Sequence, residues 1–293
     1  MSVANHPGRQ AAKALGRVGV WSSEIRADPN AGAAVRELEA GGWPSIWAPG
    51  GFDDKILGLF DNLLSETRTV LFASGILNIW RHEPEDVAAW WRGQSAERQG
   101  RVLIGVGISH APLIGDSYGK PLETMRNYLT RLGAAGLPRE RLCVAALGPK
   151  MLELCAELSA GAHPYLVPPE HTAIARKTMG ADPLLAPEQG VILETDPAKA
   201  REIGRQGVAL YTKLPNYVNS WRRLGFTDDD IANMSDRFID SIFAWGDPAA
   251  IRRRVDAHLD AGADHVCLQV ITGPPGGSSA PLDAWRALAP AML

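Results

Sequence analysis

Short apolar runs alternate with longer stretches of mixed hydrophobic and polar residues along most of the chain. This alternation is typical of a parallel sheet whose strands are joined by covering helices. The apolar runs predict eight strands, at about 16–22, 45–49, 70–78, 102–109, 142–147, 162–167, 190–194 and 265–271. Eight such units favour an α/β fold of the (β/α)8 TIM barrel type over an open sheet. We therefore expect one barrel domain over residues 15–293, preceded by an extension at residues 1–14.

Proline and glycine residues mark the ends of the predicted helices. Proline follows Gly148 and Asp247, at first-turn positions where its missing N–H is not needed. Gly180 and Gly262 stand where helices are expected to end. These markers support the alternation of helices and strands.

A long insertion separates the seventh and eighth predicted strands. It spans about 70 residues, far more than one connecting helix needs. The stretch from Asp228 carries an apolar stripe and predicts an additional helix. This insertion either packs on the barrel wall or places Tyr217, Asn219 and Trp221 over the mouth of the active site or in a dimer interface.

Charge and cysteine content restrict the partners of the chain. The 293 residues carry a net charge of -3, which argues against nucleic acid or an anionic membrane as a partner. No apolar run reaches the ~18 residues of a membrane span. Cys143, Cys155 and Cys267 form no C-x-x-C pair, so we expect a reducing, cytoplasmic setting. Residues 1–14 lack the apolar core of a signal peptide and are expected to be frayed.

Several common catalytic motifs are missing. The sequence has no His-x-His, and His82-Glu83 is not continued to a zinc-binding H-E-x-x-H. It has no G-x-S-x-G elbow, and the stretch 115–121 lacks the spacing and the Ser or Thr of a phosphate loop. We therefore expect no metal site and no serine nucleophile.

The carboxyl ends of the predicted strands, where barrels carry their active sites, are rich in glycine and tryptophan. That composition favours a large planar ligand. The turn Ala146-Leu147-Gly148 leads into a helix whose first N–H groups are suited to a phosphate, although most such turns only connect elements. His110 is the candidate for proton transfer, with a bystander histidine as the alternative.

The chain also resembles the bacterial luciferase-like monooxygenase superfamily, and within it the branch of enzymes that use the deazaflavin coenzyme F420. The resemblance runs from Leu15 to Leu293 and rests on the order and spacing of loose motifs. These are ASGILNIWRHEPEDVAAWWRGQSAERQGR, VLIGVGISHAP, ALGPKMLELCAELSAGAHPYLVPPEHT and GDPAAIRRRVDAHLDAGADHVCLQVI.

The resemblance implies an F420-dependent oxidoreductase that transfers a hydride between the deazaflavin and a small organic substrate, and it implies a homodimer. It also implies a cis peptide bond between Gly75 and Ile76. Residues implied to surround the ring are Trp21, Trp47, Gly75, Ile76, Asn78, Gly107, Ile108 and Ser109. The cofactor phosphate is expected on Ala146, Leu147 and Gly148, with Arg81 or Lys150 as cationic help. His110 matches the position of a catalytic glutamate in a related sugar-phosphate dehydrogenase.

Two departures from that dehydrogenase bear on the substrate. Its Asp-His pair after the second strand is replaced by Gly50-Gly51, and its substrate-phosphate lysine is replaced by Glu170. We therefore expect a less anionic substrate, with Glu170 and His171 either lining its site or forming an ordinary helix start. An FMN-dependent monooxygenase of the same fold and a non-catalytic deazaflavin-binding or flavin-binding protein are the alternatives.

Overall fold

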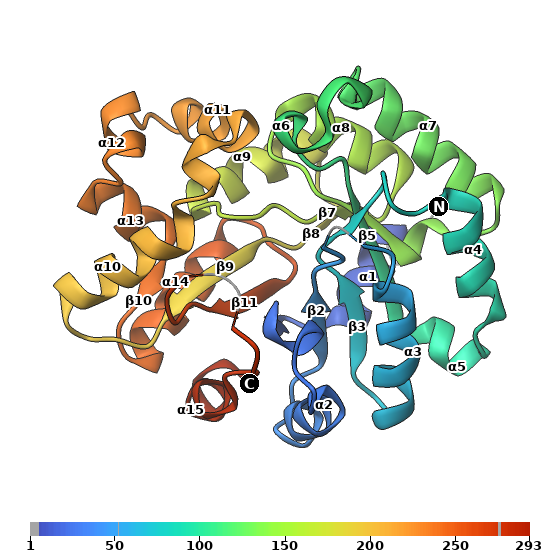
Figure 1. The fold of residues 1–293 in the computed structure, drawn as a ribbon, viewed down its shortest axis with the longest axis horizontal. Coiled ribbons are helices and arrows are strands. Elements are labelled where there is room, and N and C mark those ends of the chain that lie inside the picture. The colour runs from blue at the N-terminus through green and yellow to red at the C-terminus, as the bar shows by residue number, and fades with distance from the viewer. Residues whose placement is uncertain (1–5, 52, 275–276) are drawn as a thin grey trace.

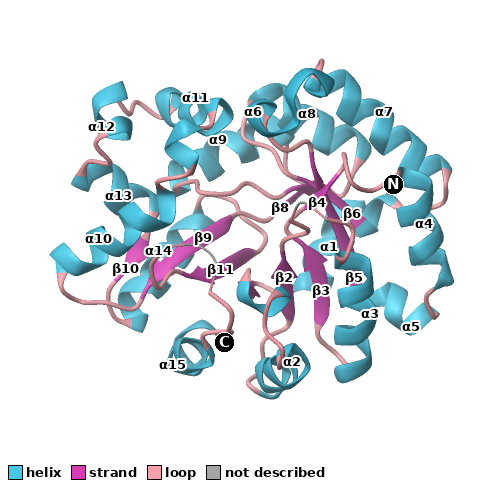
Figure 2. Ribbon diagram, viewed as in Figure 1, coloured by secondary structure: helices cyan, strands magenta, loops and turns pink. Residues whose placement is uncertain are grey.

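A computed structural model describes residues 6–51, 53–274 and 277–293. Figures 1 and 2 show a central ring of strands surrounded by helices. The strands are β1 (Val18–Trp21), β2 (Ser45–Ala48), β3 (Leu71–Ser74), β4 (Leu77–Asn78), β5 (Val102–Gly107), β6 (Leu142–Val144), β7 (Gly161–Ala162), β8 (Leu184–Leu185), β9 (Glu188–Ile192), β10 (Ala244–Trp245) and β11 (Val266–Val270).

Helix α1 precedes the first strand, and the other helices follow the strands around the outside of the ring. They are α1 (Pro7–Leu15), α2 (Ala31–Ala40), α3 (Ile56–Glu66), α4 (Pro84–Gly93), α5 (Ala96–Gly100), α6 (Ala111–Ile114), α7 (Pro121–Ala134), α8 (Pro149–Leu158), α9 (Pro169–Met179), α10 (Pro197–Val208), α11 (Pro215–Arg223), α12 (Asp228–Ala232), α13 (Asp236–Ile242), α14 (Pro248–Asp260) and α15 (Leu282–Met292). Eight of these helices begin on a proline after a residue of extended backbone, as first-turn prolines prefer.

The sheet closes on itself through the segment from β8 to β9. β8 pairs with β7, whereas β9 pairs with β11, and β11 pairs in turn with β1. Every pair among the described strands is parallel. The predicted (β/α)8 barrel is therefore confirmed.

Three strands differ most from their predicted bounds, while the others are shorter by up to three residues. The seventh barrel strand begins at Leu184, whereas the sequence predicted its start at Gly190. Pro183 and Pro187 give this stretch the composition of a loop, which is why the sequence predicted no strand there. The third is divided into β3 and β4 around Gly75 and Ile76. The sixth ends at Ala162, so that the residues after it leave the sheet.

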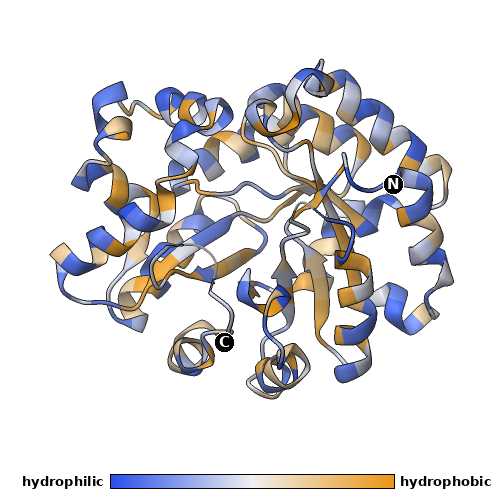
Figure 3. Cartoon of the chain, in the orientation of Figure 1, coloured by the Kyte–Doolittle hydropathy of each residue, from blue (hydrophilic) through white to orange (hydrophobic). Residues whose placement is uncertain are grey.

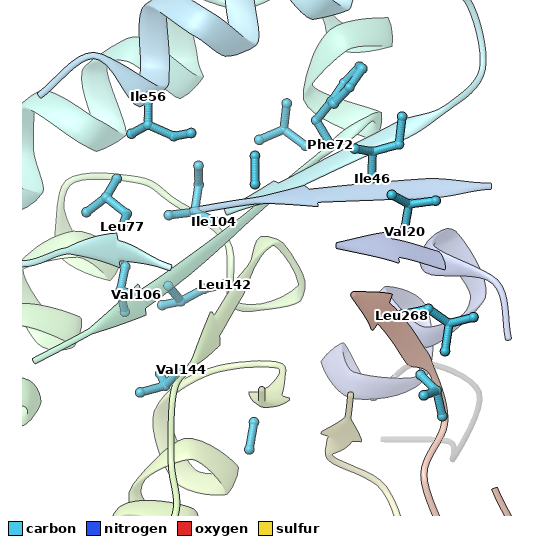
Figure 4. Close-up of a cluster of buried hydrophobic side chains, with 14 of the residues drawn as sticks. Val20, Ile46, Ile56, Phe72, Leu77, Ile104, Val106, Leu142, Val144 and Leu268 are labelled. Atoms are coloured by element: carbon cyan, nitrogen blue, oxygen red, sulfur yellow. The ribbon is translucent and has the colours of Figure 1, made fainter. Parts of the chain in front are cut away.

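Alternate strand residues face two different cores. Val20, Ile46, Phe72, Ile104 and Leu268 point outward against the helices, and Figure 4 shows them as one layer. In Figure 3 the apolar colour follows the strands and the helix faces turned toward them. The strand residues between these positions fill the inside of the barrel, where Trp47, Leu103 and Cys143 belong to a separate cluster.

Residues 7–15 form helix α1, so the expectation of a frayed extension is wrong for residues 7–14, and its part at residues 1–5 lies outside the described residues. Ala11 and Leu15 of α1 are buried in the cluster inside the barrel. Gly8 lies so close to the backbone of Pro183 and Leu184 that a Cβ would collide with it. Helix α1 therefore packs against β8 and contributes to the core.

The insertion before β11 has a core of its own. Trp221 of α11 and Phe238 of α13 are fully buried in this core, and their rings meet edge to face. The indole Nε1 of Trp221 donates a hydrogen bond to the carbonyl of Leu166, 3.1 Å away, which ties the insertion to the loop after β7. Figure 1 shows α10 to α13 gathered at one side of the barrel. Among the described residues, no helix is long and apolar enough to cross a membrane.

Candidate active site at the carboxyl ends of the strands

Two adjoining cavities of about 210 and 480 Å³ lie at the carboxyl ends of the strands. Both are lined by Ile76, Ser109, His110, Ala145, His163, Tyr165 and Tyr217. The smaller cavity extends to Trp21 and Tyr211, and the larger one extends to the start of α8. Because they share these residues, the two cavities form one site with two arms, which we call the inner and the outer cavity.

The bulge between β3 and β4 forms one wall of both cavities. The Gly75–Ile76 peptide bond is cis, as the resemblance implied. A Cβ on Gly107 would lie 2.6 Å from Cδ1 of Ile76, so only glycine lets the isoleucine side chain lie against β5. A Cβ on Gly50 would lie 2.9 Å from the Ile76 carbonyl oxygen. Glycines on both neighbouring strands thus make room for the bulge.

His110 lies where the inner and outer cavities meet. The preceding residue, Ser109, has a φ of 62°, a left-handed conformation that is uncommon for residues other than glycine and concentrates at functional sites. The Nδ1–H of His110 donates to Oδ1 of Asn216 on α11, at 2.9 Å, which leaves Nε2 as an acceptor. Burial lowers the pKa of His110, and the bond to Asn216 opposes that effect. The imidazole is therefore neutral at pH 7 and able to accept a proton.

His163, at the end of β7, presents a second imidazole to both cavities. Its Nδ1–H donates to the Ala186 carbonyl at 2.7 Å, whereas its buried Nε2 has no partner. Burial lowers the pKa of His163 to about 4. The ring stacks on Trp47 with the centroids 4.3 Å apart, so its position is fixed by packing as well as by the hydrogen bond.

The amino end of α8 forms the far end of the outer cavity. Its first residue, Pro149, has no N–H, and the Met151 N–H donates to the Gly148 carbonyl at 3.1 Å, so the Lys150 N–H is the first-turn donor that remains for a ligand. Lys150, Asn219 and Arg223 also line this end. A helix amino end with two nearby cations attracts an anion.

Most of the predicted site residues come together in these cavities. Those that line one or both are Trp21, Gly75, Ile76, Asn78, Gly107, Ile108, Ser109, His110, Ala146, Leu147 and Gly148. Of the two cations considered for the phosphate, Lys150 lines the outer cavity and Arg81 lines neither.

Three predicted residues do not line either cavity. Trp47 is fully buried inside the barrel, where its Nε1 donates to His265 at 3.1 Å. Glu170 is exposed on the first turn of α9. His171 is buried beside it, and its Nε2 donates to the Leu147 carbonyl at 2.9 Å, so it supports the turn before α8.

The cavities also contain residues that sequence reasoning missed. His163 and Tyr165 were assigned to the interior of a strand that in fact ends at Ala162. Pro164, within that stretch, is the signal that could have shortened the strand, since proline cannot pair within a sheet. Asn216 and Tyr211 come from the insertion, and no local pattern connects them with strand ends. Among the described residues, no group of three or more His, Cys, Asp or Glu side chains is placed to bind a metal.

The fold was compared with those of known proteins. No protein-family model matches the chain, and no curated protein matches it in sequence. Among solved structures, an F420-dependent secondary alcohol dehydrogenase in complex with an F420-acetone adduct has 15% identity and a TM-score of 0.71, over 94% of this chain and 99% of that one. The coenzyme F420-dependent tetrahydromethanopterin reductase from Methanopyrus kandleri has 15% identity and a TM-score of 0.70, over 93% and 97%.

A third similar structure binds a different cofactor. The oxygenating constituent of 3,6-diketocamphane monooxygenase from Pseudomonas putida, in complex with FMN, has 13% identity and a TM-score of 0.60, over 93% of this chain and 95% of that one. The chain has the fold of these enzymes. That fold is shared by F420-dependent oxidoreductases and luciferase-like monooxygenases, in agreement with the resemblance in the sequence.

Proposed function

We propose that the protein is an F420-dependent oxidoreductase that transfers a hydride between the deazaflavin coenzyme and a small organic substrate. The observation that carries this proposal is the single site with two arms, which joins an apolar wall around Ile76 to an anion-attracting end at α8. The planar ring of F420 matches the apolar wall, and its acidic tail matches the end at α8. The two F420-dependent enzymes also have higher TM-scores, 0.71 and 0.70, than the FMN enzyme at 0.60.

The residues at the site fit such a cofactor. Gly75, Gly107 and Ile76 form a surface without side-chain polar groups, suited to the face of a ring. Ala146, Leu147 and Gly148, with Lys150 and Arg223 nearby, are placed to hold the phosphate and the acidic tail. When bound, the deazaflavin supplies or accepts the hydride, and the protein contributes orientation and proton transfer.

His110 is the residue we assign to the substrate proton. Its Nε2 is free to accept a proton when an alcohol is oxidised and to return it in the reverse reaction. The bond from Nδ1 to Asn216 fixes the tautomer that this role requires. The ring is also only partly buried, so the proton has a route to solvent.

Cofactor titration tests the proposal. The purified apo protein is titrated with F420 and separately with FMN while cofactor fluorescence is followed. We expect micromolar or tighter binding of F420 and weaker binding of FMN. Micromolar binding of FMN together with no binding of F420 would identify an FMN-dependent protein instead.

Turnover distinguishes an enzyme from a protein that only binds the cofactor. If F420 binds but no alcohol of a test panel reduces it and no ketone oxidises its reduced form, the result would favour a protein that only binds the cofactor. The resemblance further supports a homodimer as part of the proposal, which light scattering on the eluting protein measures directly.

A further inference from the structure

Two buried polar atoms in the inner cavity lack a hydrogen-bond partner. The indole N–H of Trp21 and Nε2 of His163 are both unpartnered, although their side chains are only 5% and 2% exposed. Buried polar groups in folded proteins almost always have partners. Trp91 and Trp285 also have unpartnered indole N–H groups, but neither lines the inner or the outer cavity.

The two atoms lie close to one another across the backbone of Gly75. The point that a Cβ of residue 75 would occupy is 2.5 Å from Nε1 of Trp21 and 3.1 Å from Nε2 of His163. These two distances place the two nitrogen atoms no more than 5.6 Å apart, so a single ligand oxygen between them in the inner cavity can be within hydrogen-bond reach of both. A side chain at this position would collide with the indole of Trp21, so glycine lets both rings keep their places.

The hydrogen-bonding roles of the two atoms are opposite and fixed. Indole nitrogen only donates. Nδ1–H of His163 is committed to the Ala186 carbonyl, so its Nε2 only accepts. A hydroxyl group is the smallest ligand group that satisfies both atoms, because it accepts one hydrogen bond and donates another. A carbonyl oxygen satisfies Trp21 alone.

We infer that Trp21 and His163 bind the oxygen of an uncharged hydroxyl or carbonyl substrate in the inner cavity. This inference rests on the proposed function for the identity of the reaction, and it moves Trp21 from the expected cofactor seat to the substrate. His163 is a positioning residue for the bound alcohol. Because an alcohol has a single hydroxyl hydrogen, that hydrogen turns from Nε2 of His163 to Nε2 of His110, which lines the same cavity, for the proton transfer assigned to His110. The division follows from burial, since an imidazolium at His163 would be enclosed without a carboxylate partner among the described residues.

Charge and size define the substrate class. The described residues that line the inner cavity include no Asp, Glu, Lys or Arg, so a charged substrate would lose its hydration without gaining a counterion. Trp21, Tyr165, Tyr211 and Tyr217 supply aromatic walls, with centroids 5.0 to 6.3 Å apart between neighbouring rings. The volume of about 210 Å³ exceeds the ~150 Å³ that accommodates benzene in a protein interior. A six-membered ring carrying one oxygen therefore fits.

Two probes and two variants test the inference. Cyclohexanol and cyclohexanone are titrated by calorimetry into apo and F420-saturated protein, using the wild type, Trp21→Phe and His163→Asn. Phenylalanine removes the N–H and keeps an aromatic ring, and asparagine keeps a donor for the Ala186 carbonyl. We expect Trp21→Phe to weaken both probes about tenfold, because both accept from the indole. His163→Asn should weaken cyclohexanol by a similar factor and leave cyclohexanone unchanged.

Charge selectivity and a matched variant complete the test. Cyclohexylammonium and cyclohexanecarboxylate should bind at least ten times more weakly than cyclohexanol. Trp90→Phe is the control, since it removes an indole N–H that already donates to Asp61 at 3.1 Å and lines neither cavity. It should change no probe affinity. Thermal unfolding of each variant separates lost binding from lost folding.

Several results would overturn the inference. These are no binding of either probe to the wild type, equal affinities in all variants, or tighter binding of a charged probe. A tenfold change in F420 affinity in Trp21→Phe or His163→Asn would assign the two atoms to the cofactor instead. If the wild type binds neither F420 nor FMN, the proposed function fails, but the probe pattern in the apo protein still decides this inference.

Discussion

At the scale of single residues, the site depends on which hydrogen-bonding atoms are already committed. His110 and His163 both donate from Nδ1 and both present Nε2 to the same space. Their surroundings separate them, since His110 faces an amide oxygen near solvent and His163 is enclosed. The same side chain is therefore suited to moving a proton in one place and to holding a substrate in the other.

The pH dependence of turnover tests the role of His110. In the direction of substrate oxidation the neutral imidazole is the active form, so kcat/KM should fall as the pH drops through its pKa. That pKa is below the ordinary value because of burial, and the bond to Asn216 raises it. Asn216→Ala should therefore shift the acid limb to lower pH. His110→Ala should lower kcat by about 10²- to 10⁴-fold.

The control for this pH profile is Asn219→Ala, which changes a residue of the same cavity that bonds to Arg222 rather than to His110. Its acid limb should coincide with that of the wild type. An acid limb that stays in place in Asn216→Ala, or full activity in His110→Ala, would contradict the assignment.

At the scale of elements, helix ends and close contacts place the cavity walls. Proline begins α8 and sets the Gly148 turn at the end of the outer cavity, while α11 brings Asn216 and Tyr217 to its other side. Helix α1 closes the opposite end of the barrel, where Gly8 touches the backbone beside β8. An element predicted to be frayed therefore packs against the strand that closes the ring.

The contact of α1 predicts opposite effects for two glycine substitutions in helices. Gly8→Ala should lower the free energy of unfolding, because its Cβ would collide with the backbone of Pro183 and Leu184. Gly58→Ala in α3 should raise it by about 1 kcal/mol, because nothing lies within 4 Å and alanine is the better helix former. Urea unfolding measures both. Equal, stabilising effects would mean that α1 is not docked.

At the scale of the whole molecule, the inside of the barrel contains an unusual acid. Glu188 of β9 is fully buried, its Oε2 accepts from the Leu166 N–H at 3.1 Å, and its Oε1 has no partner. Burial raises its pKa to about 8. The carboxyl group is therefore mainly protonated at pH 7, and ionising it acts against the folded state of the whole barrel.

Stability should accordingly depend on pH through this one group. A folded-state pKa above the unfolded value means that stability is full at low pH and is lost as the pH rises from about 4.5 to about 8. Glu188→Gln cannot ionise and should remove this loss. The variant should match the wild type within about 1 kcal/mol at pH 5 and exceed it by several kcal/mol at pH 9.

Urea unfolding of both proteins at pH 5, 7 and 9 measures the effect. A difference between the two that does not change with pH would show that Glu188 is charged, or exposed to water, in the folded protein.

Local patterns by themselves predicted the alternation of strands and helices, the long insertion and the turn before α8, and they marked His110 as a candidate, because each depends on residues close together in the chain. Tertiary structure decided which tryptophan faces a ligand. Trp21 and Trp47 both lie near the carboxyl ends of apolar strands, yet Trp21 lines the inner cavity and Trp47 is buried against the ring of His163. It also decided the role of His163, since its hydrogen bond to Ala186 and its position beside Gly75 exist only when the ring of strands is closed. Contacts between distant strands depend on sheet register and closure, and no short stretch of sequence contains that information.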